Sequence, residues 1–482
     1  MGQRMPLVQV QSTFPEPALL MPAAAYAVGA RFRRYSMLPF LRIAVGTLQP
    51  RADASPVLWA LMEALERRGL RVQSFLSRAC FASRDGATTI TGQSPRHLDS
   101  WLMPRDVCAS LFLRGCRSCD VAIVEGELKG DSTPTGGSLD TLCDWLALPR
   151  VAVVDCTTLA QCQLPSPPPH VDGVLLDQLS GHGQFVRMQT TLEGLWGLPV
   201  LGGLSASPSL KQVVDNIPIG AKPSEEVCQK LGDNFLKISD PERILEIAAS
   251  RAFPSRPDSA CEALPPASRL HVAVAFDEAF NCYFPDTLDA LEMQGAAVSD
   301  FSPLRDERLP ADADIVYFGC GHPERFAVDL GENQCMLSAL RNHLCNGRRI
   351  YAEGGGLAYL CQHLDDGAHR RPMVGALPAT AHLEMKTYEP RAVEFSVARD
   401  CWLAPTGTRL RGYVNPAWRL QPTGPLHQFA EAGHELDLVG RHQAIGSRVH
   451  LHFAAHADGL GGFFAPHAAA MDATASLSAR QK

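Results

Sequence analysis

Residues 349–358, with the sequence RIYAEGGGLA, join a short apolar run to an apolar helical pattern through Glu353 and three glycines. A strand that turns sharply into a helix is where α/β hydrolytic folds hold a nucleophile, because the strained turn exposes one side chain beside the amides that begin the helix. The residue after Glu353 is Gly354, which has no reactive side chain. The layout therefore predicts the shape of a hydrolytic site without its nucleophile.

A second chemical signal lies near residue 46, where an apolar run is followed by a loop and a helical pattern. The run, Gly46, Thr47, the loop and the helix have the layout of a phosphate-binding loop, in which backbone amides and a lysine surround the phosphates. The loop has no second glycine and no lysine, and Asp53 lies where the lysine would be. A unit charge about 5 Å from a phosphate is worth about 3 kcal/mol at an effective dielectric near 20, so an ordinary βα turn is favoured over a working nucleotide loop.

Other polar residues have weaker spacing signals. Glu125 ends the apolar run VAIVEGE, and a carboxylate at the end of a buried strand is a common magnesium ligand in nucleotide enzymes; a local hydrogen-bonding role is the alternative. His450 and His452 would share one face of a strand, but they could bind a metal only with a third ligand. Cys116 and Cys119 form a lone CxxC, for which packing is favoured over metal or redox use.

The elements that must position these groups alternate along the chain from Leu41 onward. Near-continuous apolar runs are separated by amphipathic stretches such as residues 56–68, a pattern typical of a parallel sheet covered by helices on both faces. The first series of runs is LRIAVGTL, LRVQSFL, VAIVEGE, RVAVVDC, VDGVLLDQL and LPVLGGL, and the second begins with LHVAVAFDEAF, GAAVSDFSPL, ADIVYFGCG and RRIYAEGGG. We therefore predict an α/β protein with two parallel-sheet domains.

A proline-, serine- and alanine-rich stretch at residues 253–268 separates the two series and indicates a linker. The N-terminal segment is expected to be disordered or over-annotated, and the alanine- and serine-rich end of the chain a frayed tail. The predicted segments are residues 1–40 for the N-terminal segment, 41–250 for the first domain, 251–269 for the linker, 270–466 for the second domain and 467–482 for the tail.

Composition excludes several classes of protein. The chain has 482 residues with a formal charge of −7 and no basic block, so nucleic acid is not an expected partner. Its 15 cysteines follow no repeating frame, which is typical of reduced cytoplasmic proteins. The apolar run near the N-terminus contains Pro22, is followed rather than preceded by basic residues, and is too short for a membrane span.

Nine stretches match one known family: PRHLDSWLM, VAIVEGE, GGSLDTLCDWLALPRVAVVD, GLPVLGGL, VAVAFDEAFNCYFPDTLDALEMQGA, FSPLRDERLP, YFGCGHPERFA, AEGGGLAYLC and VHLHFAAH. Through them the chain resembles, from about Leu41 to Pro466, the cobyrinic acid a,c-diamide synthase family of glutamine-dependent amidotransferases. The resemblance implies an ATP-dependent synthetase domain of phosphate-loop, dethiobiotin-synthetase type, followed by a class I glutamine amidotransferase domain of flavodoxin-like fold. It also implies ATP and Mg²⁺ as cofactors and a corrinoid or other tetrapyrrole as ligand. The pathway that it implies is cobalamin biosynthesis.

In the synthetase half, the resemblance leaves a partial cofactor site. Of the family's phosphate loop only Gly46, Thr47 and Ser55 match, whereas Asp99 and Glu125 match retained acidic positions, with Glu125 the remaining magnesium-ligand candidate. The segment expected to supply further magnesium ligands carries other residues at its key positions, and the nearest acid is displaced. These residues are Leu76, Cys80 and Ser83, with Asp85 as the displaced acid.

In the amidotransferase half, the resemblance implies that the nucleophilic cysteine is replaced by Gly354 and that His450 is the retained base candidate. Cys320 replaces a glycine of the family's oxyanion-forming loop, so it is expected near the vacant position, where a substitute nucleophile would need a different attack geometry. Tyr413 stands in the place of a further family motif.

Two principal hypotheses follow. The first is a pseudoenzyme that has lost the nucleophile and the loop lysine, and that binds a corrinoid or tetrapyrrole, or pairs as a homodimer or with an active paralogue. The alternative is an active ATP-dependent, ammonia-using amidoligase with Asp99 and Glu125 in its site. A structural partner unrelated to tetrapyrroles is a third possibility that no residue selects.

Overall fold

The structure is a computed structural model. The predicted N-terminal segment apart from Phe40, most of the predicted linker, the predicted tail and Ser83 lie outside the residues that it describes. The described residues are 40–49, 53–81, 84–128, 136–157, 169–218, 220–253, 270–384, 390–414, 416–434, 436–456 and 459–464.

The first domain is built on a parallel seven-stranded sheet with the order β3-β2-β4-β1-β5-β6-β7. Every residue of the central strand β1 is buried, because helices cover both faces, and this explains the near-continuous apolar runs. The strands are β1 (Leu41–Thr47), β2 (Val72–Leu76), β3 (Arg96–His97), β4 (Val121–Glu127), β5 (Arg150–Asp155), β6 (Gly173–Leu179) and β7 (Val200–Ser205). The fold class predicted for this half of the chain is confirmed.

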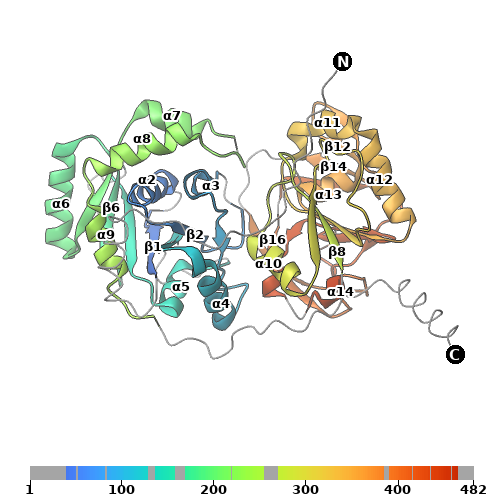
Figure 1. Cartoon of the computed structure of the whole chain (residues 1–482), viewed down its shortest axis with the longest axis horizontal. Coiled ribbons are helices and arrows are strands. Elements are labelled where there is room, and N and C mark those ends of the chain that lie inside the picture. The colour runs from blue at the N-terminus through green and yellow to red at the C-terminus, as the bar shows by residue number, and fades with distance from the viewer. Residues whose placement is uncertain are drawn as a thin grey trace, which may run out of the picture.

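Helices form the outer layers of this domain (Figure 1). The stretch predicted as an amphipathic helix at residues 56–68 is α2 (Ser55–Glu66), with a proline in its first turn, a position where proline is tolerated. The other helices are α3 (Gly86–Thr91), α4 (Arg105–Gly115), α5 (Leu139–Leu146), α6 (His182–Trp196), α7 (Pro208–Asp215), α8 (Glu225–Leu236) and α9 (Pro241–Ala248). One apolar core lies under α2, α8 and α9, and another lies under α4 and α5.

The second domain contains a seven-stranded sheet with the order β18-β19-β20-β11-β10-β8-β9. Its five strands from β20 to β9 are parallel, and two antiparallel strands extend it at one edge. The strands are β8 (His271–Ala275), β9 (Ala297–Phe301), β10 (Ile315–Phe318), β11 (Arg349–Glu353), β18 (His427–Gln428), β19 (Leu438–Arg441) and β20 (Ala444–Ser447). Its helices are α10 (Pro285–Met293), α11 (Ala327–Glu332), α12 (Gln334–Cys345), α13 (Gly355–Leu360) and α14 (Gly461–Phe464).

Two smaller sheets occupy the glycine- and histidine-rich part of this domain. One contains β12 (Cys361–Asp365), β13 (Arg370–Pro372), β14 (Leu377–Leu383) and β17 (Trp418–Pro422). The other contains β15 (Arg391–Ser396), β16 (Arg409–Val414) and β21 (Val449–His450). In β21, His450 is placed opposite Tyr413 of β16, so this small sheet fixes the retained base candidate.

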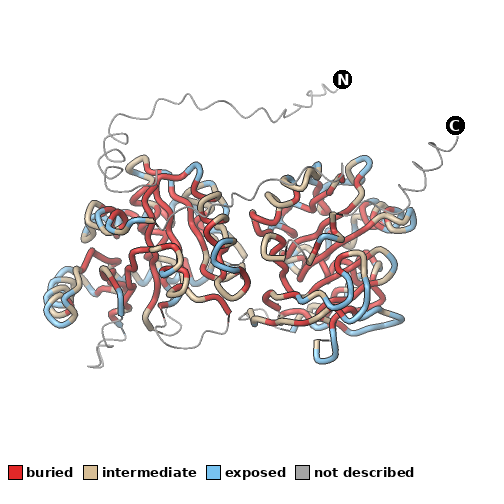
Figure 2. The backbone as a smooth tube through the Cα atoms, turned by 90° about the horizontal axis from the view of Figure 1, so that it is seen from below, coloured by how far each residue is buried: buried red, intermediate tan, exposed pale blue. Residues whose placement is uncertain are grey.

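The two domains lie side by side, with β16 and α10 on the side that faces the first domain (Figure 1). Buried segments run through the interior of both domains, and exposed segments lie mainly at the periphery (Figure 2). Arg96 of the first domain forms an ion pair with Asp286 of the second, and Arg411 Nη1 donates to the Trp101 carbonyl at 3.0 Å. Specific polar contacts therefore hold the two domains together.

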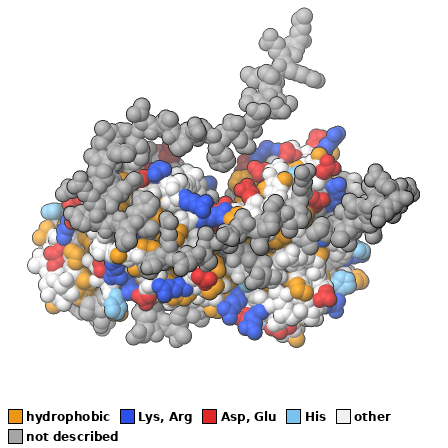
Figure 3. Space-filling view, turned by 60° about the horizontal axis from the view of Figure 1, so that its bottom comes forward, with side chains coloured by type: hydrophobic (Ala, Val, Ile, Leu, Met, Phe, Trp, Pro, Cys, Tyr) orange, Lys and Arg blue, Asp and Glu red, His pale blue; other side chains and the backbone are white. Residues whose placement is uncertain are grey.

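Acidic and basic side chains lie interspersed over the face shown in Figure 3. Within the described part of the chain, no helix has the length and apolar character needed to cross a membrane.

Candidate functional site

The predicted sharp turn lies between β11 and α13. Gly354 caps the helix with φ 50° and ψ −111°, a left-handed backbone conformation that side-chain-bearing residues rarely adopt. Its N–H donates to the Ser447 carbonyl at 2.9 Å, and its own carbonyl accepts from the Ala358 N–H at 3.2 Å. This turn has the layout that the sequence predicted, and its apex is a glycine, which adopts a positive φ without steric cost.

Two further residues predicted from the sequence lie at this elbow. A Cβ built on Gly354 would lie 2.8 Å from Cys320 Sγ and 3.2 Å from His450 Nε2. Cys320 Sγ itself lies 3.1 Å from Nε2 and 3.2 Å from Nδ1 of His450. Cys320 is 4% exposed and His450 is 6% exposed. The structure therefore brings Gly354, Cys320 and His450, three residues predicted from the sequence to share one site, together at one buried point.

Electrostatics keep this centre uncharged at neutral pH. Burial lowers the pKa of His450 to about 4, so its imidazole is neutral. Burial raises the pKa of Cys320 well above its usual value, and the neighbouring Glu353 carboxyl raises it further. Glu353 is buried too, which raises its own pKa to about 8, although it accepts from the Tyr351 hydroxyl at 2.7 Å. A thiol with a raised pKa is a poor nucleophile, so Cys320 is not activated.

Two loops of the first domain reach this part of the second domain. The ring of Phe81, in the loop after β2, lies 5.2 Å from the His450 ring and stacks on Phe284 at 4.7 Å. Gly220, from another loop of the first domain, approaches the oxyanion-loop residue His322 so closely that a Cβ would lie 2.1 Å from its Nε2. Sequence reasoning missed both contacts, because neither short loop carries a signal for its partner.

The predicted phosphate loop begins at the carboxyl end of β1. Thr47 is buried, and a Cβ at Gly46 would lie 2.8 Å from both Leu128 and Leu139, so this glycine serves packing. Asp53 Oδ1 accepts from the Ser55 N–H at 2.9 Å, at the N-terminus of α2. Unpaired amides and the helix dipole make such a terminus favourable for an anion. Here the carboxylate of Asp53 supplies that negative charge from within the chain.

A cavity of about 320 Å³ opens beside this loop. Glu125 lies in its wall at the end of β4, where its Oε1 accepts from the Ser74 hydroxyl at 3.4 Å, and burial raises its pKa to about 7. The charged residues of the wall are Asp53, Arg78, Glu125 and Glu127. A hollow of about 90 Å³ also includes Asp53 in its wall, and its other charged residues are Asp155, Asp177, Lys211 and Asp215. Carboxylates therefore outnumber cations along this edge of the sheet.

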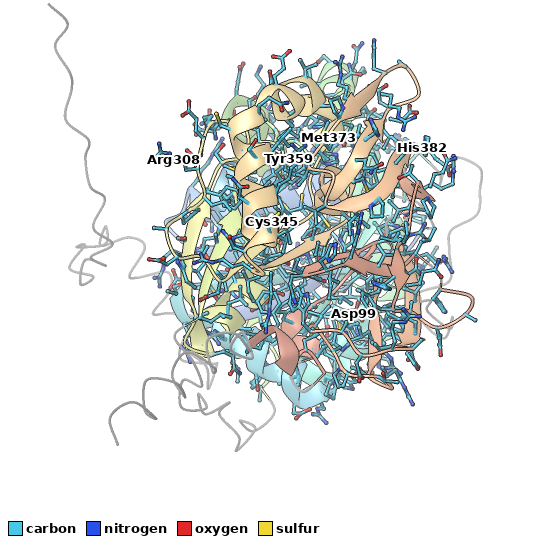
Figure 4. The ribbon with its side chains drawn as sticks, turned by 90° about the vertical axis from the view of Figure 1, so that its right-hand side faces the viewer. Asp99, Arg308, Cys345, Tyr359, Met373 and His382 are labelled. Carbon is cyan, nitrogen blue, oxygen red and sulfur yellow. The ribbon has the colours of Figure 1, made fainter. Side chains whose placement is uncertain are left out.

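Asp99 is not part of this cavity wall, although it packs against Gly137, which is. It makes a buried junction between the domains. Its Oδ1 accepts from the Trp101 and Leu102 N–H groups, both at 2.9 Å. Its Oδ2 accepts from the Ala79 N–H at 3.0 Å and from the Tyr413 hydroxyl at 2.6 Å. In Figure 4 it lies well apart from Tyr359 and Met373. Its carboxyl oxygens are thus engaged by the protein itself.

The remaining candidates are buried. His452 is 0% exposed, and its Nε2 lies 4.0 Å from Asp286 Oδ2. Cys116 and Cys119, after α4, are also buried. Among the residues that the structure describes, no group of three or more His, Cys, Asp or Glu side chains could hold a metal ion.

These features define the class of protein: an α/β protein with two domains built on mainly parallel sheets, in which a sharp strand-to-helix turn of the second domain holds Gly354 beside Cys320 and His450. Residues 271–458 match the family profile described as a CobB/CobQ-like glutamine amidotransferase domain. A solved glutamine amidotransferase is 16% identical, covers 40% of this chain and 96% of its own, and superposes with a TM-score of 0.31, too low to carry an argument.

Relatives matched over most of the chain narrow this class. Cobyrinate a,c-diamide synthase of Dehalococcoides mccartyi strain CBDB1 is 29% identical over 453 residues, which cover 87% of this chain and 96% of that protein. The enzyme of the same name from Syntrophotalea carbinolica is 30% identical over 395 residues, which cover 77% of this chain and 84% of that protein. The chain belongs to the cobyrinate a,c-diamide synthase family, which confirms the family predicted from the sequence.

Proposed function

We propose that this chain is a pseudoenzyme of the cobyrinate a,c-diamide synthase family, which binds a corrinoid or related tetrapyrrole, or an active partner, without turning over glutamine. The observation that carries this proposal is Gly354 at the apex of the elbow. Glutamine hydrolysis at such an elbow proceeds through a thioester, and a hydrogen atom cannot be acylated. Cys320, the sulfur beside it, is buried and has a raised pKa, so it does not substitute.

ATP and Mg²⁺, which the family resemblance implies, do not fit the first domain well. At the N-terminus of α2 the Ser55 N–H already donates to the Asp53 carboxylate. The loop before this helix has no lysine. Each unit charge about 5 Å from a phosphate is worth about 3 kcal/mol at an effective dielectric near 20, so Asp53 disfavours a triphosphate. Among the positions that match the family, Glu125 is the remaining magnesium-ligand candidate, and burial, with the nearby carboxylates of Asp85 and Asp53, raises its pKa to about 7, which weakens it as a ligand.

The intact framework supports a binding role. Both domains keep closely packed apolar cores, and the contacts of Tyr413 with Asp99 and of Arg96 with Asp286 hold the domains together. The family resemblance favours a corrinoid as the ligand, and the cavity of about 320 Å³ at the carboxyl edge of the first sheet is its proposed entry point. A homodimer or an active paralogue is the proposed alternative partner.

Three measurements test the proposal. We expect no ammonia release from glutamine, an ATP–Mg²⁺ dissociation constant above about 100 μM by calorimetry, which corresponds to about −5.5 kcal/mol, and a change in the corrinoid absorbance spectrum when cobyrinate is titrated with protein. The matched control is the His450→Gln variant. Ammonia release that disappears in this variant would overturn the proposal.

An ammonia-using amidoligase is the second candidate, because Glu125 is kept in the cavity wall and its pKa of about 7 would suit proton transfer near neutral pH. It requires ADP formation that depends on both cobyrinate and ammonium. Such turnover, if lost in a Glu125→Gln variant, would replace the pseudoenzyme proposal with this one.

A further inference from the structure

The Cys320 side chain occupies the space that a nucleophile at position 354 would need. A Cβ added to Gly354 would lie 2.8 Å from Cys320 Sγ, and real Cβ atoms essentially never approach another heavy atom within 3.0 Å. A full cysteine side chain would extend further into the same space. A side chain at position 354 therefore requires the Cys320 sulfur to move.

The same sulfur also engages the other parts of the centre. It lies 3.1 Å from Nε2 and 3.2 Å from Nδ1 of His450, so it is about equally close to both ring nitrogens. The backbone N–H of Gly355 also donates to Cys320. An amide in this position, next to the elbow apex, is the kind of donor that stabilises an oxyanion. One side chain thus contacts the base, the amide donor and the vacant nucleophile position.

The backbone around Cys320 has little freedom to move the sulfur away. Cys320 and Cys282 exchange two backbone hydrogen bonds, of 3.0 and 3.1 Å. On either side of Cys320, a Cβ at Gly319 would lie 2.5 Å from the Tyr283 ring, and one at Gly321 would lie 2.0 Å from the Ala279 carbonyl oxygen. Both flanking residues are therefore packed against neighbours, so the main chain holds the Cys320 side chain at the elbow.

We propose that Cys320 is a positioning residue that closes the amidotransferase centre, so that a side chain at position 354 is accommodated only when the Cys320 side chain is removed. This inference rests on the proposed function. By family resemblance, cysteine and glycine have changed places between the elbow and the oxyanion loop. The centre is then inactive for two reasons: position 354 has no thiol, and the sulfur of Cys320 occupies the space that such a thiol would need.

The steric part is tested by Gly354→Ala in the native and the Cys320→Gly backgrounds. The left-handed backbone strain at position 354 is common to both backgrounds, so the cycle isolates the contact between Cβ and sulfur. We expect Gly354→Ala to lower the melting temperature by at least about 3 °C more in the native background, the shift that a coupling of about 1 kcal/mol produces in a domain of this size. Cys361→Ala, another buried cysteine of the domain, is the matched control background and should give no such relief. Equal losses in all three backgrounds would overturn the proposal.

The chemical part is tested by installing the thiol. Iodoacetamide labelling of residue 354, measured by mass spectrometry, should be at least tenfold faster in Gly354→Cys/Cys320→Gly than in Gly354→Cys alone, and should slow when His450→Gln is added. Folding of the double variant but not of the single one would also support the proposal. Equal labelling rates would contradict it. If neither cysteine variant folds, the comparison of Gly354→Ala in the three backgrounds decides.

The two proposals fail separately. Glutamine turnover by the native chain that depends on His450 would refute the pseudoenzyme proposal. The coupling between residues 320 and 354 would still be decided by the melting temperatures of the Gly354→Ala variants.

Discussion

Replacing Tyr413 by phenylalanine removes one oxygen from the buried junction between the domains. The Tyr413 hydroxyl donates to Asp99 Oδ2 at 2.6 Å and accepts from the Gly137 N–H at 2.9 Å. Tyr413 is 1% exposed, so water cannot replace the hydroxyl without rearrangement. Its ring stays in place because its edge-to-face contact with Trp101 does not need the oxygen.

The expected loss follows from these two hydrogen bonds. A bond to a carboxylate contributes about 1.5–3 kcal/mol, and a buried amide left unpaired costs about 1–3 kcal/mol. Asp99 keeps its three backbone donors, at Ala79, Trp101 and Leu102, which limits the damage on its side. We therefore expect Tyr413→Phe to lower the free energy of unfolding by about 3 kcal/mol, which corresponds to about 6–12 °C in melting temperature.

Tyr359→Phe is the matched control for this experiment. Tyr359 is also buried, but its hydroxyl has no hydrogen-bond partner within the described part of the chain. Its ring contacts with Phe280 and Phe318 do not involve the oxygen. We expect a change within about 0.5 kcal/mol for this variant, measured by urea unfolding beside Tyr413→Phe. Similar losses in the two variants would refute the reasoning about the junction.

Three further predictions address the covered centre, the phosphate loop and the pH dependence. Phe81→Ala should raise the pKa of His450 from about 4 towards its ordinary value, because the ring that shields the imidazole is removed; an unchanged value by NMR titration would contradict this. Asp53→Asn should increase the affinity for pyrophosphate at low salt about tenfold by calorimetry, since the helix terminus loses its internal anion. The gain stays below the value for an unscreened charge, because Asp53 is 52% exposed and lies 3.7 Å from Arg84 Nη1; unchanged binding would speak against a self-capped loop. The pKa of Glu353 is raised from 4.5 to about 8 in the folded state, so its contribution to stability is fully present below pH 4.5 and is lost as the pH rises through 8. Glu353→Gln should therefore lose less stability than the native chain between pH 5 and pH 8 in urea unfolding, and parallel curves would contradict this.

The sheets could be predicted because their physical cause is local. Strands buried on both faces need continuous apolar runs, and each run in the first series corresponds to a strand. The run RVHLHF forms a shorter strand than its alternating pattern indicates. Only Val449 and His450 pair with β16, and the chain then leaves the sheet. Its alternating pattern is equally compatible with a longer strand, so the end of pairing could not be predicted from the sequence.

The centre could be predicted in part. The family resemblance predicted Gly354, His450 and Cys320 near one another, and the structure brings them together. The contacts between domains could not be predicted, because Asp99 and Tyr413 are 314 residues apart and nothing in either segment specifies its partner. The same holds for Phe81, an apolar residue in a short loop that is as compatible with ordinary packing as with covering His450.

The two sites that we propose to be altered share one physical feature. In each, an internal side chain would take the place of a ligand or a reacting group. The Asp53 carboxylate occupies the helix terminus where a phosphate would bind, and the Cys320 sulfur occupies the elbow beside His450. A site whose donors are already satisfied gains nothing from the original ligand, whereas freeing it removes a contact that stabilises the fold. Restoring either site alone should thus lower the stability of the free protein while it raises ligand affinity. For the native chain, ATP or glutamine should leave the melting temperature unchanged, because only a ligand that binds the folded state raises it.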